Sequence, residues 1–269
     1  MIMNEININH DELKKHGIVK VKNFLTHDEL QILKNILSNK LEKNHPKSYF
    51  SSNLRFLLYK ILKFRFLDFK NHLYILKLAR NKKLNTIADN YFKRKSYIKF
   101  IDSYYSPISD KDVLPWHTDQ AYEGDEKNYS GYVNPDHAHM KFFIYLTEIG
   151  PDNGCMSYIP GSHKIGYVLR EGIFNKKIKY ENYYLLKDFR SIVQKNTDYL
   201  TNQLDEKFVQ NFLKDTEFAA KNITTTKFDY SLSAGDAIIF DEGGVHKGSK
   251  SLKNERIVLR YLYSTKKNK

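Results

Sequence analysis

The segment Leu114–Gln120, which reads LPWHTDQ, contains a histidine and an aspartate with one residue between them. Because alternate residues of an extended segment point to the same side, the imidazole of His117 and the carboxylate of Asp119 could face one point. A third ligand must come from elsewhere in the chain, and our candidate is His246, in FDEGGVHKGS. Two histidines and one carboxylate form the facial triad of non-haem Fe(II) oxygenases, which leaves open coordination positions on the metal.

An HxD pair by itself is a weak signal, because so short a motif often occurs by chance. The chain offers a second such pair, His137 and His139, at a turn that leads into an expected strand. We interpret this second pair as structural, and it is the alternative metal site if the first pair does not bind metal.

The composition of the chain limits its class. A length of 269 residues suits one large domain or two small ones, and 41% hydrophobic residues are enough to bury a core. The only cysteine, Cys155, excludes an internal disulfide and is typical of a reducing compartment. The sequence shows neither a signal-peptide pattern nor an apolar stretch of about 18 residues, so we expect a cytoplasmic protein without a membrane span.

The net charge of +13 could attract an anionic small molecule or a nucleic acid. Most of the basic residues are lysines, whereas arginine is the better bidentate reader of phosphates and bases. We therefore do not expect nucleic acid as the partner. We expect a small-molecule substrate, of which the positive charge favours an anionic one, for a protein that is a monomer or a homodimer.

Residues 1–95 are expected to be mainly helical. Asn9 and Gly17 are typical of the start and the end of a short helix, and residues 26–29, THDE, form a capping box. Between these two helices, GIVKVKNF alternates like a strand. Helical spacing recurs in residues 50–95; we favour a helical layer packed on a sheet over a segment lying on a membrane surface.

From Ser96 onward the chain has short β-branched and aromatic runs separated by turn signals. Such runs predict a sandwich or barrel, in residues 96–164 and 216–265. Residues 165–215 interrupt this pattern and are predicted to be a partly helical insertion that covers a site. We expect one domain over residues 1–269.

The order of these features resembles the phytanoyl-CoA dioxygenase family of Fe(II)- and 2-oxoglutarate-dependent oxygenases. PWHTDQ resembles the metal motif of that family, and TEIGPDNGCMSYIPGSHK resembles its turn, strand and PGSH signature. LSAGDAIIFDEGGVHKGS resembles the strand that leads to the distal histidine, and NERIVLRY resembles the last core strand. HGIVKVKNFLTHDEL resembles the opening strand and helix.

The resemblance implies a mainly β fold with buttressing helices (α+β), whose core is a double-stranded β-helix, the jelly roll of cupin-like proteins. It implies that His117, Asp119 and His246 hold Fe(II), with 2-oxoglutarate and O₂ as cosubstrates. The implied reaction is hydroxylation of a small molecule with release of succinate and CO₂. Arg256, or Arg260 on the same side of the last strand, would bind the distal carboxylate of 2-oxoglutarate.

Further candidates follow from position. Tyr104 and Lys141 lie on expected strands and could contact the cosubstrate, although polar strand residues commonly face water. Trp116, Gln120 and Tyr122 surround the HxD pair and could contact the substrate; the alternatives are a core position for Trp116 and loop surface for the other two.

Two other functions fit the same pattern. One is a jelly-roll binding protein that keeps the fold without turnover, although the presence of all three ligand residues argues against it. The other is an oxygenase that acts on nucleic acid or protein.

Overall fold

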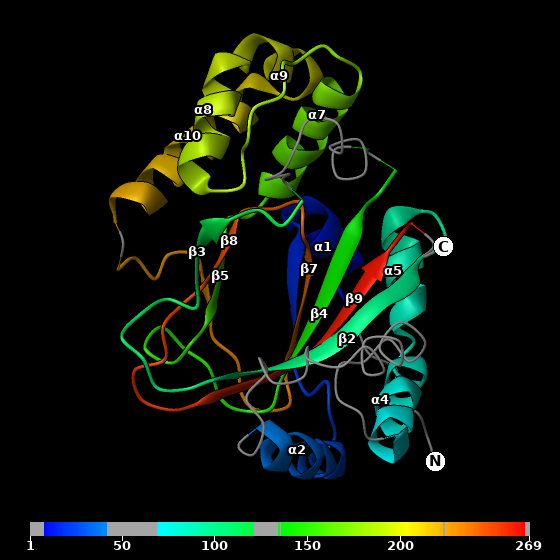
Figure 1. The fold of residues 1–269 in the computed structure, drawn as a ribbon. Coiled ribbons are helices and arrows are strands. Elements are labelled where there is room, and N and C mark those ends of the chain that lie inside the picture. The colour runs from blue at the N-terminus through cyan, green and yellow to red at the C-terminus, as the bar shows by residue number, and fades with distance from the viewer. Residues whose placement is uncertain (1–7, 42–68, 121–133, 135, 223, 267–269) are drawn as a thin grey trace, which may run out of the picture.

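The computed structural model describes residues 8–41, 69–120, 134, 136–222 and 224–266. Two antiparallel sheets form the centre of this part of the chain (Figure 1), which confirms the expected α+β architecture. The larger sheet has the order β1–β7–β4–β9–β2, and the smaller has the order β3–β8–β5–β6. The strands of the larger sheet are β1 (Ile18–Val21), β2 (Tyr97–Ser106), β4 (His139–Tyr145), β7 (Ala237–Asp241) and β9 (Arg256–Ser264). Those of the smaller sheet are β3 (Leu114–His117), β5 (Met156–Tyr158), β6 (Asp229–Tyr230) and β8 (His246–Gly248).

The larger sheet is covered by helices from the first third of the chain (Figure 1). These are α1 (His10–His16), α2 (His27–Leu41), α4 (Phe69–Asn81) and α5 (Leu84–Phe92). Apolar residues of α4 and α5, such as Ile75 and Leu84, share one buried cluster with Phe142 of β4 and Tyr261 of β9. The Tyr261 hydroxyl also donates to the Ile75 carbonyl oxygen at 2.8 Å, so α4 is fixed to the centre of the sheet.

The predicted helix ends in this region are confirmed. The Asn9 side chain accepts a hydrogen bond from the Glu12 N–H, and Gly17 closes α1 in the left-handed conformation at φ 76°. Thr26 and Glu29 bond each other's backbone N–H reciprocally, as a capping box does. Residues 42–68 lie outside the described residues, so of the expected helical layer at 50–95 only the part from Phe69 onward is seen.

A second group of helices gathers at one end of the two sheets (Figure 1). It comprises α7 (Ser162–Phe174), α8 (Leu186–Lys195), α9 (Thr197–Gln203) and α10 (Glu206–Lys221). These helices bury their apolar faces in a cluster of their own, against which Trp116 also packs. The bounds of the expected insertion, residues 165 and 215, stay a prediction. The four helices α7 to α10, called the helical layer below, lie where they can border the HxD segment.

No helix among the described residues is both long enough and apolar enough to cross a membrane. Cys155 is buried and forms no disulfide, as expected for a core position.

Candidate metal centre

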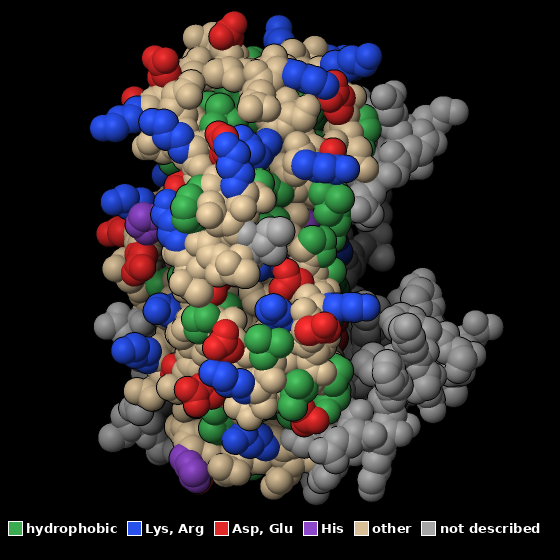
Figure 2. All heavy atoms as spheres, turned by 90° about the vertical axis from the view of Figure 1, so that its left-hand side faces the viewer, with side chains coloured by type: hydrophobic (Ala, Val, Ile, Leu, Met, Phe, Trp, Pro, Cys, Tyr) green, Lys and Arg blue, Asp and Glu red, His purple; other side chains and the backbone are tan. Residues whose placement is uncertain are grey.

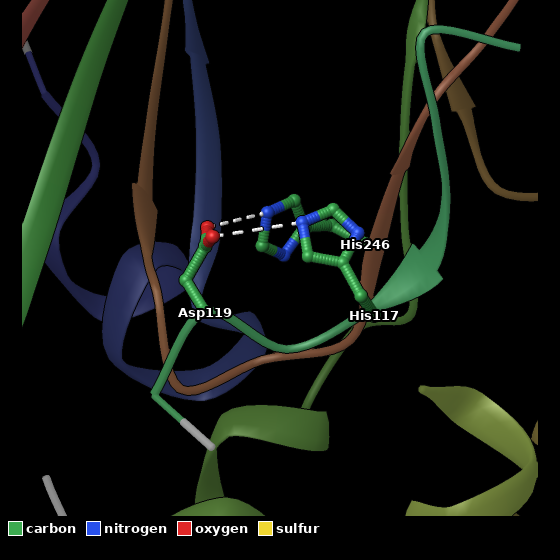
Figure 3. Close-up of side chains that lie close together, drawn as sticks. All are labelled: His117, Asp119 and His246. Carbon is green, nitrogen blue, oxygen red and sulfur yellow. Dashed lines mark ion pairs between the residues drawn. The ribbon is translucent and has the colours of Figure 1, made fainter. Parts of the chain in front are cut away.

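Three side chains meet where β3 and β8 lie side by side (Figure 3). His117 ends β3 and is the register partner of His246, the first residue of β8, while Asp119 follows two residues after His117. The Asp119 carboxylate lies 2.9 Å from His246 Nε2 and 3.6 Å from His117 Nε2. The ligand atoms of the three residues all lie within 4.8 Å of one another, so together they could hold one metal ion.

Both imidazoles are oriented by their own backbone. His117 Nδ1 lies 2.7 Å from the Pro115 carbonyl oxygen, and His246 Nδ1 lies 3.0 Å from that of Gly244. A carbonyl only accepts hydrogen bonds, so each Nδ1 carries a proton, which leaves Nε2 of each ring to face Asp119.

The electrostatics of the three residues favour a bound cation. Desolvation by burial, and then the His117 imidazole, lower the pKa of His246, so its ring is neutral at pH 7. Desolvation would raise the pKa of the Asp119 carboxyl, but the Lys141 ammonium and His246 outweigh it and hold the pKa well below its usual range. A carboxylate therefore faces two nitrogen lone pairs, and His117 Nε2 is buried without a hydrogen-bond partner among the described residues. A metal ion at this point would satisfy all three groups, so the residues fit the predicted metal.

Lys141, predicted as a cosubstrate contact, lies beside the metal ligands. It comes from β4 of the larger sheet, and its ammonium donates to Asp119 Oδ2 and, at 2.8 Å, to Glu242 Oε1. The other Glu242 oxygen lies 2.8 Å from His139 Nδ1. Sequence reasoning did not single out Glu242, although its position four residues before His246 placed it near the site.

A cavity opens between the two sheets next to these residues. From the larger sheet it is lined by Tyr104, Lys141, Phe143, Tyr145, Arg256, Val258 and Arg260. From the smaller sheet and the segment before it come Val113, Leu114, His117, Met156, His246, Lys247 and Gly248, and Asp119 completes the lining. The cavity thus joins the candidate metal ligands to both arginines predicted from the last strand.

The two arginines differ in their partners. Arg260 forms a bidentate ion pair with Asp102, with distances of 2.7 and 2.5 Å, so its charge is already compensated. Arg256 donates to the Gly154 carbonyl oxygen at 2.8 Å and to Ser106 Oγ at 3.0 Å, and it forms no ion pair with any described residue. Its Nε is buried without a hydrogen-bond partner in the described part of the chain. Arg256 is therefore the cation of the cavity that can still receive an anion.

Tyr145 is a further cavity residue that the sequence reasoning missed. Its hydroxyl is buried and has no hydrogen-bond partner among the described residues. Burial raises its pKa, so the hydroxyl keeps its proton and can donate. The signal was present: Tyr145 lies four residues after Lys141 on one strand, so strand alternation puts both on the same face. Tyr104 lies instead beneath Arg260, with its ring centroid 4.5 Å from the guanidinium carbon.

The remaining candidates lie around the centre. Trp116 packs edge-on against Phe228, with ring centroids 6.0 Å apart, and does not line the cavity. Gln120 is buried and donates to the His137 carbonyl oxygen at 3.2 Å. Tyr122 lies outside the described residues.

The alternative metal site does not assemble in the described part of the chain. His139 bonds Glu242, as described above, and neither His137 nor His139 belongs to a group of three potential ligand residues there.

The helical layer touches the metal centre through residues 184 and 185. The Tyr184 carbonyl oxygen accepts from the Thr118 N–H at 3.0 Å, and the Tyr184 ring lies 5.2 Å from the His117 ring. Leu185 forms an antiparallel bridge with His117. The segment before α8 therefore borders the side of the centre that faces the helices.

Comparison with known proteins agrees with this picture. The family model described as phytanoyl-CoA dioxygenase (PhyH) matches residues 13–256. HygX from Streptomyces hygroscopicus, solved with nickel and 2-oxoglutarate bound, is 14% identical over 96% of this chain and 86% of its own, with a TM-score of 0.53. No curated protein matches significantly.

Two other solved structures are similar. SnoK, a non-haem α-ketoglutarate-dependent carbocyclase from nogalamycin biosynthesis, is 13% identical over 95% of this chain and 82% of its own (TM-score 0.54). AviO1 from Streptomyces viridochromogenes Tue57 is 16% identical over 95% and 92% of the two chains (TM-score 0.53). At such low identities the similarity shows the shared fold, which confirms the fold class expected from the sequence.

Proposed function

Because the chain belongs to the phytanoyl-CoA dioxygenase family, we propose that it is an Fe(II)- and 2-oxoglutarate-dependent oxygenase that hydroxylates a small molecule. The observation that carries this proposal is the meeting of His117, Asp119 and His246, in which two imidazoles and a carboxylate face one point. HygX binds 2-oxoglutarate and SnoK depends on it, and both share this fold.

In this proposal His117, Asp119 and His246 hold the metal on one face. The metal and 2-oxoglutarate, when bound, supply oxidative decarboxylation, which consumes O₂, gives succinate and CO₂, and leaves one oxygen atom for the substrate. The backbone carbonyls of Pro115 and Gly244 keep both imidazoles in the ligating tautomer.

The cavity between the sheets suits the cosubstrate. Arg256 would bind the distal carboxylate of 2-oxoglutarate, since it is a buried cation without an anionic partner among the described residues, and the Tyr145 hydroxyl would donate to the same group. Lys141 and Tyr104 line the cavity between this end and the metal ligands, where the ammonium can face the carboxylate nearest the metal. The cavity walls include Phe143, Val258 and Met156, which exclude water from the cosubstrate.

We place the substrate on the side of the centre that borders the helical layer. Tyr184 lies next to His117 there, and Gln120 follows the ligand Asp119 directly. The excess of basic residues favours an anionic substrate, and we expect the enzyme to act in the cytoplasm as a monomer or a homodimer.

The test is an anaerobic titration of the protein with Fe(II) and 2-oxoglutarate, followed by the visible charge-transfer band of the chelate. We expect the band in the wild type and its loss in His117→Ala. Arg256→Ala should weaken 2-oxoglutarate binding by about 10- to 100-fold, because a charge-assisted hydrogen bond is lost.

The matched control is Arg94→Ala, which removes an exposed arginine that pairs with Asp136 at the surface; its titration should equal that of the wild type. A wild type that shows no band would contradict the metal assignment. A wild type that forms the chelate but consumes no 2-oxoglutarate in air would favour the binding-protein alternative.

A further inference from the structure

A chain of charged side chains continues from the metal centre into the larger sheet. Lys141 lies between Asp119 and Glu242, and Glu242 is in turn bound by His139. The side chains of Lys141 and Glu242 are only 6% and 5% exposed, so these charges interact without screening by water. Burying charges is costly unless they are paired, and here each charge has a partner of opposite sign.

The Lys141 ammonium poses a problem for a metal site. It donates to Asp119 Oδ2, the same oxygen that faces His246 Nε2, so it would compete with a metal ion for the carboxylate. It would also repel a divalent cation, since like charges at this range interact strongly in a buried site. A carboxylate that holds the ammonium from another direction would reduce both effects.

Two hydrogen bonds of its backbone hold Glu242 in place beside Lys141. Its N–H donates to the His139 carbonyl oxygen at 3.2 Å, and its own carbonyl oxygen accepts from Thr118 Oγ1 at 3.2 Å. Thr118 lies between the ligands His117 and Asp119, so the Glu242 backbone is anchored to the ligand loop itself.

We propose that Glu242 is a positioning residue that acts through Lys141. It offsets the ammonium charge and holds the ammonium, so that Asp119 remains available to the metal. The inference rests on the proposed function in one respect, which is that His117, Asp119 and His246 bind a divalent metal.

The test measures metal affinity without turnover, by Co(II) titration of the metal-free protein followed by the visible absorption of bound Co(II). Glu242→Gln leaves the Lys141 ammonium with Asp119 as its only anionic partner among the described residues, and we expect Co(II) binding to weaken by about 10- to 100-fold. Lys141→Met removes the competitor, and Co(II) should bind at least as tightly as in the wild type. Glu242→Asp keeps the charge, so its affinity should stay within about threefold of the wild type.

The double variant Lys141→Met/Glu242→Gln separates this role from a merely structural one. If Glu242 acts through Lys141, its loss should matter little once the lysine is gone, and the double variant should match Lys141→Met within about threefold. An equal loss of affinity in both backgrounds would show that Glu242 acts on the centre directly, which would overturn the proposal.

One control variant and three possible outcomes complete the test. Glu255→Gln, at an exposed glutamate, is the control and should not change Co(II) binding. A tenfold loss in Lys141→Met contradicts the competitor role of the lysine, and this holds even if Glu242→Gln does not fold. A wild type that binds no Co(II) defeats the proposed function and this inference together, whereas normal binding in both wild type and folded Glu242→Gln defeats this inference alone.

Discussion

The two histidine ligands obtain their orientation from their nearest sequence neighbours. In each case Nδ1 bonds the carbonyl two residues earlier, at Pro115 for His117 and at Gly244 for His246. Because these bonds are local, the sequence next to each histidine is enough to set which ring nitrogen faces Asp119. The HxD and distal histidine segments, together with the resemblance to the family, predicted the three residues that meet here.

The choice between Arg256 and Arg260 was not decided by their own sequence, because both face the same side of β9. The strand opposite gives the two arginines different partners. Asp102 is the register partner of Arg260 and Ser106 is that of Arg256, so one arginine meets a carboxylate and the other a hydroxyl. Cross-strand partners of this kind set the charge available in the cavity.

We predict that the Tyr145 hydroxyl contributes to the binding of 2-oxoglutarate. Tyr145→Phe removes only the unpartnered hydroxyl of the cavity, and we expect 2-oxoglutarate to bind about fivefold more weakly, since one hydrogen bond contributes about 1 kcal/mol. The measurement is the same anaerobic chelate titration. Tyr261→Phe, which removes a buried hydroxyl bonded to Ile75 far along the chain, should leave the affinity unchanged. Equal affinities in Tyr145→Phe and wild type would remove Tyr145 from the binding site.

At the scale of elements, the pairing of β3 with β8 assembles the centre. Their register places His117 opposite His246, and a slip of one residue would turn one imidazole to the other face. The apolar runs and turn signals do not single out β3 or β8. Only the HxD segment is expected to be extended, and no local pattern indicates that the two strands are neighbours. Strands β3 and β5 both pair with β8, which lies far from them in the sequence, so long-range contacts set the strand order of this sheet.

The turn before α7 fixes the helical layer to the first helix. His163 Nε2, in the first turn of α7, donates to the Lys14 carbonyl oxygen at 3.2 Å. Gly17 allows this approach, because a Cβ at its position would lie 2.3 Å from His163 Nδ1. The backbone there also has φ 76°, which favours glycine.

This contact predicts a pH dependence of stability. Burial lowers the pKa of His163 to about 3, whereas the unfolded chain has the ordinary value of about 6.5. Between these values the unfolded state binds more protons, so stability falls as the pH falls, by about 2 kcal/mol on reaching pH 5.

Urea unfolding at pH 7.5 and pH 5 measures this loss. In His163→Gln the amide can still donate to Lys14 but cannot titrate, so the variant should lose about 2 kcal/mol less than the wild type over the same interval. His27→Gln, at an exposed position, is the control. A variant that loses as much stability as the wild type would contradict the assignment of this loss to His163.

At the scale of the whole molecule, the site lies between the two sheets, and many other charged side chains lie on the surface. Figure 2 shows the face over the smaller sheet and the helical layer, where lysine and arginine side chains are interspersed with aspartate and glutamate. Surface ion pairs such as Lys253–Asp152 and Lys227–Asp215 show the same mixing of opposite charges. The basic side chains behind the net charge of +13 therefore do not form one uniformly basic surface on this face.

We therefore expect only weak, non-specific binding of nucleic acid. Fluorescence anisotropy with a short double-stranded DNA should give a dissociation constant of about 10⁻⁶ M or higher at physiological salt. This binding should weaken further as the salt concentration is raised. Tighter binding that persists at high salt would instead favour an oxygenase that acts on nucleic acid.

The sequence by itself determined the features that arise between neighbours along the chain. These are the helix caps at Asn9, Gly17 and Thr26, the ligand residues with their spacing, and the motif order that is typical of the family. Each depends on hydrogen bonds or side-chain directions within a few residues, so the local sequence is sufficient to predict it.

The tertiary structure decided which distant groups meet. It paired Arg260 with Asp102 and left Arg256 without a carboxylate, turned the Tyr145 hydroxyl into the same cavity, and inserted Lys141 between Asp119 and Glu242. It also placed Trp116 against Phe228, away from the cavity lining. The physical reason is strand register: the partner of a buried charge lies on another strand, and a shift of one residue would exchange it for a different group.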